Sequence, residues 1–207
     1  MKRKIIKSIT AAFLVLVLLI GGAYGFVALR IYQIENKLYP VPENANDLPE
    51  VEMVVDYAFD ISDKRKAVGF SDNVFLGFVD ECRGTMYDNV FLSEKTLHFT
   101  GFPTTYYTVC SVEDIKGETA KEKLNARVSS GVSLGGKTVE KLSGNLPEKG
   151  KLYIFLCKED KDGSLIIWQN IFLAEAADMN NYALTEEAKM LIEEYKDAYE
   201  HQDLSVS

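Results

Sequence analysis

The chain has 207 residues, of which 23 are Lys or Arg and 31 are Asp or Glu, so its formal net charge is −8 at pH 7. Residues 1–30 hold five of the basic residues and none of the acidic ones, which leaves 18 basic against 31 acidic residues in the rest of the chain. A surface with this excess of negative charge repels nucleic acid and anionic lipid headgroups, so the composition argues against nucleic-acid binding.

The first feature along the chain is an uncharged apolar stretch at residues 8–29. A helix of about 20 apolar residues is long enough to cross the hydrocarbon core of a bilayer. Four basic residues precede the stretch within residues 2–7, and only Arg30 follows it. This bias predicts a cytoplasmic tail at residues 1–7, a transmembrane signal anchor at 8–29, and the rest of the chain outside the cytoplasm.

A cleaved secretory signal is the alternative, with residues 9–20 as its apolar core. The small-x-small sequence Ala23-Tyr24-Gly25 would then be the cleavage site. However, the apolar run continues for four residues beyond Gly25, and Tyr24 and Phe26 suit a membrane interface. We therefore expect an uncleaved anchor, and either alternative places residues 31–207 outside the cytoplasm.

Residues 30–50 are expected to form a linker. Three of the five prolines lie in this segment, and proline fixes φ and removes a backbone donor. A proline-rich segment of this kind favours a semi-rigid spacer that holds the following domain away from the membrane surface.

Residues 51–175 read as one β-rich domain, which is long enough to bury a core of its own. Runs of apolar, β-branched and aromatic residues predict strands at 51–59, 73–79, 104–112, 125–130, 151–157 and 164–168. The last two flank a polar turn at 158–163 and form the clearest hairpin. A short helix is expected at 62–69, with Ser62 as its N-cap.

The last segment, residues 176–207, changes to a helical period. Its apolar positions fall on one face of a helix that begins at Thr185; they are Leu184, Ala188, Leu191, Ile192, Tyr195 and Tyr199. We expect this amphipathic helix to pack on the β domain, and a partner-binding helix is the alternative.

Two segments imitate known ligand-binding loops. Residues 131–138 satisfy the P-loop pattern, but only five residues separate Thr138 from Gly144, too few for the helix that holds phosphate. Residues 160–163 imitate the middle of a calcium loop, but Lys158 then occupies the first ligand position and Gln169 the position of the bidentate Glu. We interpret both segments as turns and expect no nucleotide, metal or other cofactor.

Catalytic groups are scarce. The only histidines are His98 and His201, so a zinc site or a Ser-His-Asp triad would depend on His98. The adjacent acids at 80–81 and at 113–114 point to opposite faces of a strand, so neither pair converges on a substrate. We therefore expect no catalytic residue.

Three cysteines and a set of aromatic residues are the remaining candidates. The cysteines are Cys82, Cys110 and Cys157, and their spacing forms no CxxC motif. They could form one disulfide and leave one free thiol, or remain three buried thiols. The aromatic set is a possible ligand face, with core packing as the alternative; its members are Tyr106, Tyr107, Tyr153 and Trp168.

Residues 65–79, 105–117 and 150–156 resemble an uncharacterised family of exported or membrane-anchored Gram-positive bacterial proteins with a small β-barrel domain. Their order is also distantly similar to netrin-like domains of the OB type. Some netrin-like domains inhibit proteases by presenting an N-terminal Cys to a metal, and this chain has no such Cys. The resemblance implies a barrel and transfers no activity.

Together these patterns predict a mainly β (α+β) fold. It would consist of an OB-like β-barrel domain, an N-terminal transmembrane helix and a C-terminal amphipathic helix. The expected function is non-enzymatic binding of a protein or envelope component outside the cytoplasm. The alternatives are a cell-envelope hydrolase with loop-assembled carboxylates and a membrane-held immunity or regulatory protein.

Overall fold

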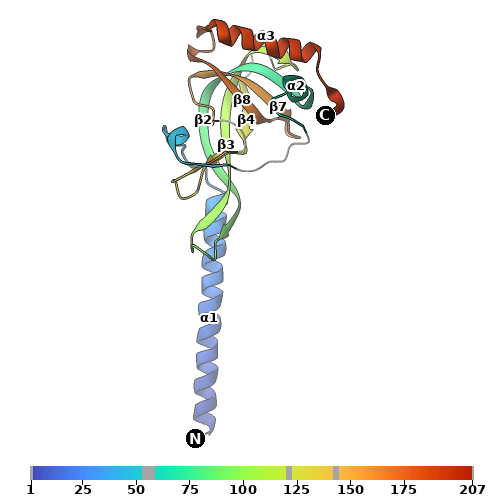
Figure 1. Ribbon diagram of the computed structural model, residues 1–207. Coiled ribbons are helices and arrows are strands. Elements are labelled where there is room, and N and C mark those ends of the chain that lie inside the picture. The colour runs from blue at the N-terminus through green and yellow to red at the C-terminus, as the bar shows by residue number, and fades with distance from the viewer. Residues whose placement is uncertain (1, 53–58, 120–122, 142–144, 207) are drawn as a thin grey trace.

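The computed structural model describes residues 2–52, 59–119, 123–141 and 145–206 (Figure 1). Most of the strand expected at 51–59 lies outside the described residues. The described elements comprise a long N-terminal helix, a large and a small β-sheet, and two helices that lie beside the large sheet at the end opposite the N-terminus.

The N-terminal helix α1 (Lys2–Glu35) projects from the β-rich part of the molecule as a single rod (Figure 1). Within it, Val15–Glu35 is predominantly apolar, and side chains such as Leu18 and Leu19 are largely exposed. The helix is therefore long and apolar enough to cross a membrane. It ends at Glu35, six residues beyond the predicted transmembrane segment.

The segment after α1 contacts the domain at several points. Ile34 and Ala45 are buried, although residues 30–50 were expected to be a spacer outside the core. Tyr39 and Thr85 exchange two backbone hydrogen bonds of 2.8 Å. Gly84, which precedes Thr85, has a φ of +131°, and a Cβ there would lie 2.6 Å from the Tyr39 carbonyl oxygen. Only glycine permits this close approach.

A short 3-10 helix, η1 (Ala45–Asp47), leads into the small sheet. This sheet has the order β1-β6-β5, with β1 (Glu50–Glu52) parallel to β6 (Val139–Lys141) and β5 (Gly131–Val132) antiparallel to β6. The P-loop-like segment is the turn between β5 and β6, where the Ser133 N–H donates to the Thr138 carbonyl at 2.8 Å. Because β6 follows Thr138 directly, the expectation of a glycine-rich turn is confirmed.

The large sheet has the strand order β4-β3-β2-β7-β8-β9. Its strands are β2 (Asn73–Leu92), β3 (Phe99–Lys116), β4 (Lys123–Val128), β7 (Lys151–Glu159), β8 (Leu165–Asp178) and β9 (Asn181–Tyr182). All neighbours in this order are antiparallel, and β4 also pairs with β8 in parallel through Ala126–Leu165 and Arg127–Ile166. The prediction of a mainly β fold with a helix at each end is confirmed.

The first part of β2, residues 73–79, and the middle of β7 are buried on both faces, which explains their continuous apolar runs. Val74 and Leu76 of β2 join Ile154 of β7 in one core cluster, which also contains residues of the C-terminal helix. Phe75 of β2 and Phe155 of β7 join the other cluster, with their ring centroids 5.7 Å apart. Successive residues therefore supply two separate cores.

Helices α2 (Lys64–Phe70) and α3 (Glu186–Glu200) cover the first of these cores (Figure 1). Asp63 caps α2 by accepting from the Arg65 and Lys66 N–H groups, so the cap lies one residue later than predicted. Thr185 caps α3 as predicted, through a 3.2 Å bond from the Ala188 N–H.

The buried face of α3 contains Ala188, Ile192 and Tyr195, all of which the helical period predicted. Tyr199 has the right angular position but is 40% exposed. The last turn of α3 instead packs toward α2 through Ala198, which lines the groove between the two helices. Strand β8 runs to Asp178 and β9 follows it, so strand residues precede α3 within 176–207.

Candidate binding site

Strands β2, β3 and β4 and the turn between β7 and β8 enclose a cleft of about 440 Å³. The turn is held by a 2.8 Å bond from the Asp160 N–H to the Ser164 carbonyl, as expected for a hairpin turn rather than a calcium loop. The charged, amide and aromatic side chains that line the cleft are Arg83, Tyr106, Lys123, Asn125, Arg127 and Asp162.

Strand register places Tyr106 and Arg127 beside each other. Tyr106 of β3 lies opposite Arg127 of β4 and opposite Gly84 of β2. Residues directly opposite each other in a ladder point to the same face of a sheet, so the ring and the guanidinium group share one wall of the cleft. The Tyr106 side chain is half-buried, which leaves part of its ring open to the cleft.

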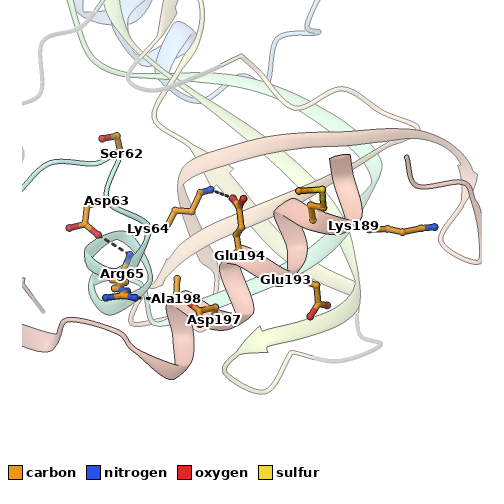
Figure 2. A pocket seen from close by; sticks show the side chains of 10 residues that line it. Ser62, Asp63, Lys64, Arg65, Lys189, Glu193, Glu194, Asp197 and Ala198 are labelled. Carbon is orange, nitrogen blue, oxygen red and sulfur yellow. Dashed lines mark hydrogen bonds and ion pairs between the residues drawn. The ribbon is translucent and has the colours of Figure 1, made fainter. Parts of the chain in front are cut away.

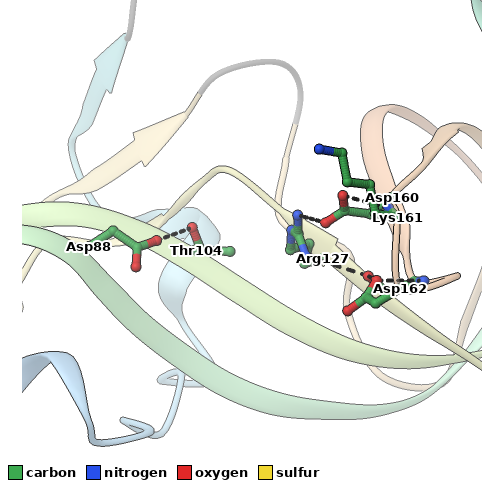
Figure 3. A network of polar contacts seen from close by, with 7 residues as sticks. Asp88, Thr104, Arg127, Asp160, Lys161 and Asp162 are labelled. Atoms are coloured by element: carbon green, nitrogen blue, oxygen red, sulfur yellow. Dashed lines mark hydrogen bonds and ion pairs between the residues drawn. The ribbon is translucent and has the colours of Figure 1, made fainter.

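Arg127 joins β4 to the β7–β8 turn (Figure 3). Its guanidinium group forms an ion pair with Asp160 and donates to the Ser164 hydroxyl at 3.4 Å. The Lys161 N–H, donating at 2.7 Å, and then Arg127 lower the pKa of Asp160. The pKa of Asp162 is lowered by hydrogen bonds from the Ser164 hydroxyl and N–H. Both carboxylates are therefore ionised at neutral pH and are poor proton donors.

The other two cations of the cleft differ in their partners. Lys123 forms a 2.8 Å ion pair with Asp80. Arg83 donates to the side-chain oxygen of Asn125 at 3.3 Å and, within the described residues, forms no ion pair. Among the cations of this cleft, Arg83 therefore differs: no carboxylate of the described residues neutralises its charge.

A larger groove of about 980 Å³ lies between α2 and α3 (Figure 2). Its cations are paired: Lys64 with Glu194, Arg65 with Asp197 at 3.9 Å, and Lys189 with Glu186 at 2.7 Å. These pairs join or flank the two helices. The groove is shallow and its charges are compensated, so it offers a ligand less than the smaller cleft does.

A third cavity, of about 540 Å³, separates the segment after α1 from the loop before β7. Val41, Ala45, Leu146 and Pro147 make its lining mostly apolar, and Cys82 contributes a half-buried thiol. The Cys82 thiol lies beside the fully buried Tyr107 hydroxyl, and burial raises the pKa of both groups.

The four aromatic residues proposed as a ligand face do not lie together on the surface. Tyr107 and Tyr153 are buried in the core cluster of Phe75 and Phe155, and Trp168 is buried in the cluster beneath the helices. Tyr106 lines the cleft described above, and Tyr153 contributes to a separate, smaller cavity of about 250 Å³ beside Phe172. The alternation of side chains along a strand separates Tyr106 from its neighbour Tyr107.

The three cysteines are all free thiols, with Cys110 and Cys157 buried. His98 is exposed at the turn between β2 and β3. Across the residues that the structure describes, no group of three or more His, Cys, Asp or Glu side chains is placed to hold a metal.

The adjacent acids contact different partners. Asp80 pairs with Lys123, whereas Glu113 pairs with Lys196 of α3 at 2.8 Å. Asp114, next to Glu113, accepts from the Thr119 N–H at 3.0 Å. The Glu113–Asp114 pair therefore diverges, as strand geometry requires.

Sequence reasoning missed Arg83 and Arg127. The signal for Arg127 was its place inside a weak strand, opposite an aromatic residue, but neither its partner strand nor the register could be read from the chain. Comparison with models of known protein families and with curated proteins gives no match. The resemblance to exported Gram-positive proteins and to netrin-like domains stays a prediction.

Proposed function

We propose that this chain is a single-pass membrane protein whose β domain lies outside the cytoplasm and binds a protein or envelope component without catalysing a reaction. Helix α1 supports the anchor, because its apolar side chains are exposed over a length that fits a bilayer. The cluster of basic residues before residue 8 supports a cytoplasmic N-terminus.

We also infer that the domain is a closed OB-like barrel. The order β4-β3-β2-β7-β8, with a parallel contact between the first and last strands, matches the order of strands in a five-stranded OB barrel. The Arg127–Asp160 ion pair supports closure, because it connects β4 to the turn that precedes β8. The cluster around Phe75 and Phe155 would fill the interior.

One observation carries the binding proposal: the unneutralised Arg83 guanidinium and the half-buried Tyr106 ring line the same cleft. Arginine forms strong, directional hydrogen bonds with carboxylate and phosphate groups, and an exposed aromatic face supplies apolar contact area. The ligand would therefore carry a carboxylate or phosphate group next to an apolar or planar portion.

The protonation state of the carboxyl groups in and beside the cleft favours binding over hydrolysis. A glycosidase or similar hydrolase needs one protonated acid near a second carboxylate. Asp162 lines this cleft and its pKa is lowered, as is that of Asp160 in the same turn, while Asp80 beside the cleft is paired with Lys123.

The test is photo-crosslinking in living cells with a benzophenone amino acid in place of Tyr106. We expect a discrete adduct that the substitution Arg83→Ala abolishes. The matched controls are the same crosslinker at Tyr199, a 40% exposed tyrosine on α3, and the substitution Arg65→Ala at the helix groove. Equal adducts at 106 and 199, or an adduct that persists in Arg83→Ala, would refute binding in this cleft.

A further inference from the structure

The hairpin of β2 and β3 carries exposed apolar side chains at its tip and along its strands. Phe91 is 51% exposed, Leu97 is 74% exposed and Phe102 is 55% exposed. Glu94 and Lys95 are the only Asp, Glu, Lys or Arg residues between 89 and 102, and their charges cancel. In a domain with a large excess of acidic residues, this tip is neutral and apolar.

Leu97 is also strained. Its φ is +54°, a left-handed conformation that is uncommon outside glycine, asparagine and aspartate. The turn is held by a bond from the Leu97 N–H to the Ser93 carbonyl at 2.8 Å and by one from the Ser93 N–H to the His98 carbonyl at 2.9 Å. The left-handed conformation costs folding free energy and the exposed side chain gains little from burial, so the folded domain alone does not account for this leucine.

The hairpin is fixed against the end of α1. Ile34 is buried with Tyr87 and Val90 of β2, and Ile31 packs against the same cluster. The Glu35 carboxylate accepts a 3.0 Å hydrogen bond from the Val90 N–H. These contacts hold the helix and the hairpin in a defined relative orientation.

The tip lies at the level of the apolar part of α1. From Val90 the hairpin continues for three or four residues toward the N-terminal end of α1 (Figure 1), a reach of about 10–13 Å in extended chain. At a rise of 1.5 Å per residue, that reach equals about seven to nine residues of helix. Counted back from Glu35, the tip is level with roughly residues 26–28, inside the predicted membrane segment.

We propose that the tip of this hairpin inserts into the same bilayer that α1 crosses and forms a second membrane contact. The apolar tip would contact the boundary between the acyl chains and the headgroups of the lipid. It lies at about the same height along α1 as exposed apolar side chains of that helix, such as Phe26 and Leu29. Its neutral charge fits apolar insertion rather than attraction to anionic headgroups. The inference rests on the proposed membrane anchor.

The experiment uses the full chain reconstituted in phosphatidylcholine vesicles that contain phosphatidylglycerol, with and without brominated acyl chains. Leu97→Trp and, as a second probe, Thr96→Trp at an exposed position of the same turn place tryptophan at the tip. Met190→Trp is the matched control, because Met190 is 64% exposed on α3 at the opposite end of the molecule (Figure 1). The wild-type chain, whose single tryptophan is buried, supplies the background.

We expect brominated lipid to quench the tip tryptophans several-fold more than the tryptophan at 190, together with a blue shift of their emission. Two results would overturn the inference. If the chain floats with the vesicles but both tip probes behave like the probe at 190, the second contact is wrong and the anchor stands. If the chain does not float with the vesicles, the anchor fails and the second contact fails with it.

Discussion

The carboxylate of Glu35, the last residue of α1, accepts a hydrogen bond from the backbone N–H of Val90 on β2. The bond joins positions 55 residues apart in the sequence. Together with the burial of Ile34, it makes the junction between α1 and the domain an ordered contact rather than a free hinge. The orientation of the β domain relative to the membrane would follow from this contact.

Glu35→Ala should loosen this junction. A hydrogen bond to a charged group contributes about 1.5–3 kcal/mol, so the Val90 amide should exchange hydrogen roughly tenfold to a hundredfold faster. Hydrogen exchange of the β2 amides in the full chain in detergent measures the effect. Glu43→Ala, at an exposed position nearby, should leave the rate unchanged. Unaltered exchange in Glu35→Ala would show that the bond does not hold the junction.

Phe155→Ala should destabilise the domain strongly. The Phe155 ring is fully buried and packs against Phe75 and Tyr153. Truncation of a buried phenylalanine costs about 3–5 kcal/mol. Phe172→Ala on the neighbouring strand is the control, because Phe172 is 51% exposed and its loss should cost about 1 kcal/mol or less. Urea unfolding, monitored by the fluorescence of Trp168, gives both free energies of unfolding. Equal decreases in the two variants would mean that Phe155 is not part of the core.

Stability should fall as the pH rises from about 10 to 12. Burial raises the pKa of Tyr87, Tyr153 and Tyr195 to about 12 from an ordinary value of 10.0. Below pH 10 these tyrosines are neutral in both states. Between the two values the unfolded chain loses protons that the folded chain retains, so alkali favours unfolding.

Tyr195→Phe tests this assignment, because it removes one of the three ionisable groups and keeps the ring. The urea midpoint of this variant should decrease less between pH 8 and pH 11 than that of the wild-type chain. An identical decrease in the two proteins would mean that Tyr195 ionises as freely in the folded state as in the unfolded state.

The three thiols should differ in reactivity. Cys82 is half-buried at a cavity, whereas Cys110 and Cys157 are buried. Burial raises the pKa of all three, so alkylation should be slow. Under native conditions N-ethylmaleimide should modify Cys82 first, as peptide mass spectrometry can show. Earlier modification of Cys157 would contradict the packing of β7.

The local pattern of the sequence predicted the elements of the fold well. The continuous apolar run at 73–79 marked a strand buried on both faces, and Thr185 marked the start of α3. These features depend on residues close together in the chain, where periodicity and capping rules apply directly.

The candidate site was harder to predict, because it depends on register between distant strands. Tyr106 meets Arg127 across one ladder, and Arg127 meets Asp160 across 33 residues of sequence. The docking of Ile34 against Val90 was missed for the same reason. Three prolines in the following segment indicated a spacer, and composition alone does not reveal which apolar residues find a partner.

The central claim is that α1 remains attached as a membrane anchor and holds the β domain outside the cytoplasm. Mass spectrometry of the mature chain from the membrane fraction tests it most directly. We predict an N-terminal peptide that includes the basic residues before residue 8. A mature chain that starts at Phe26 would show that residues 1–25 are a cleaved signal, and it would contradict the anchor.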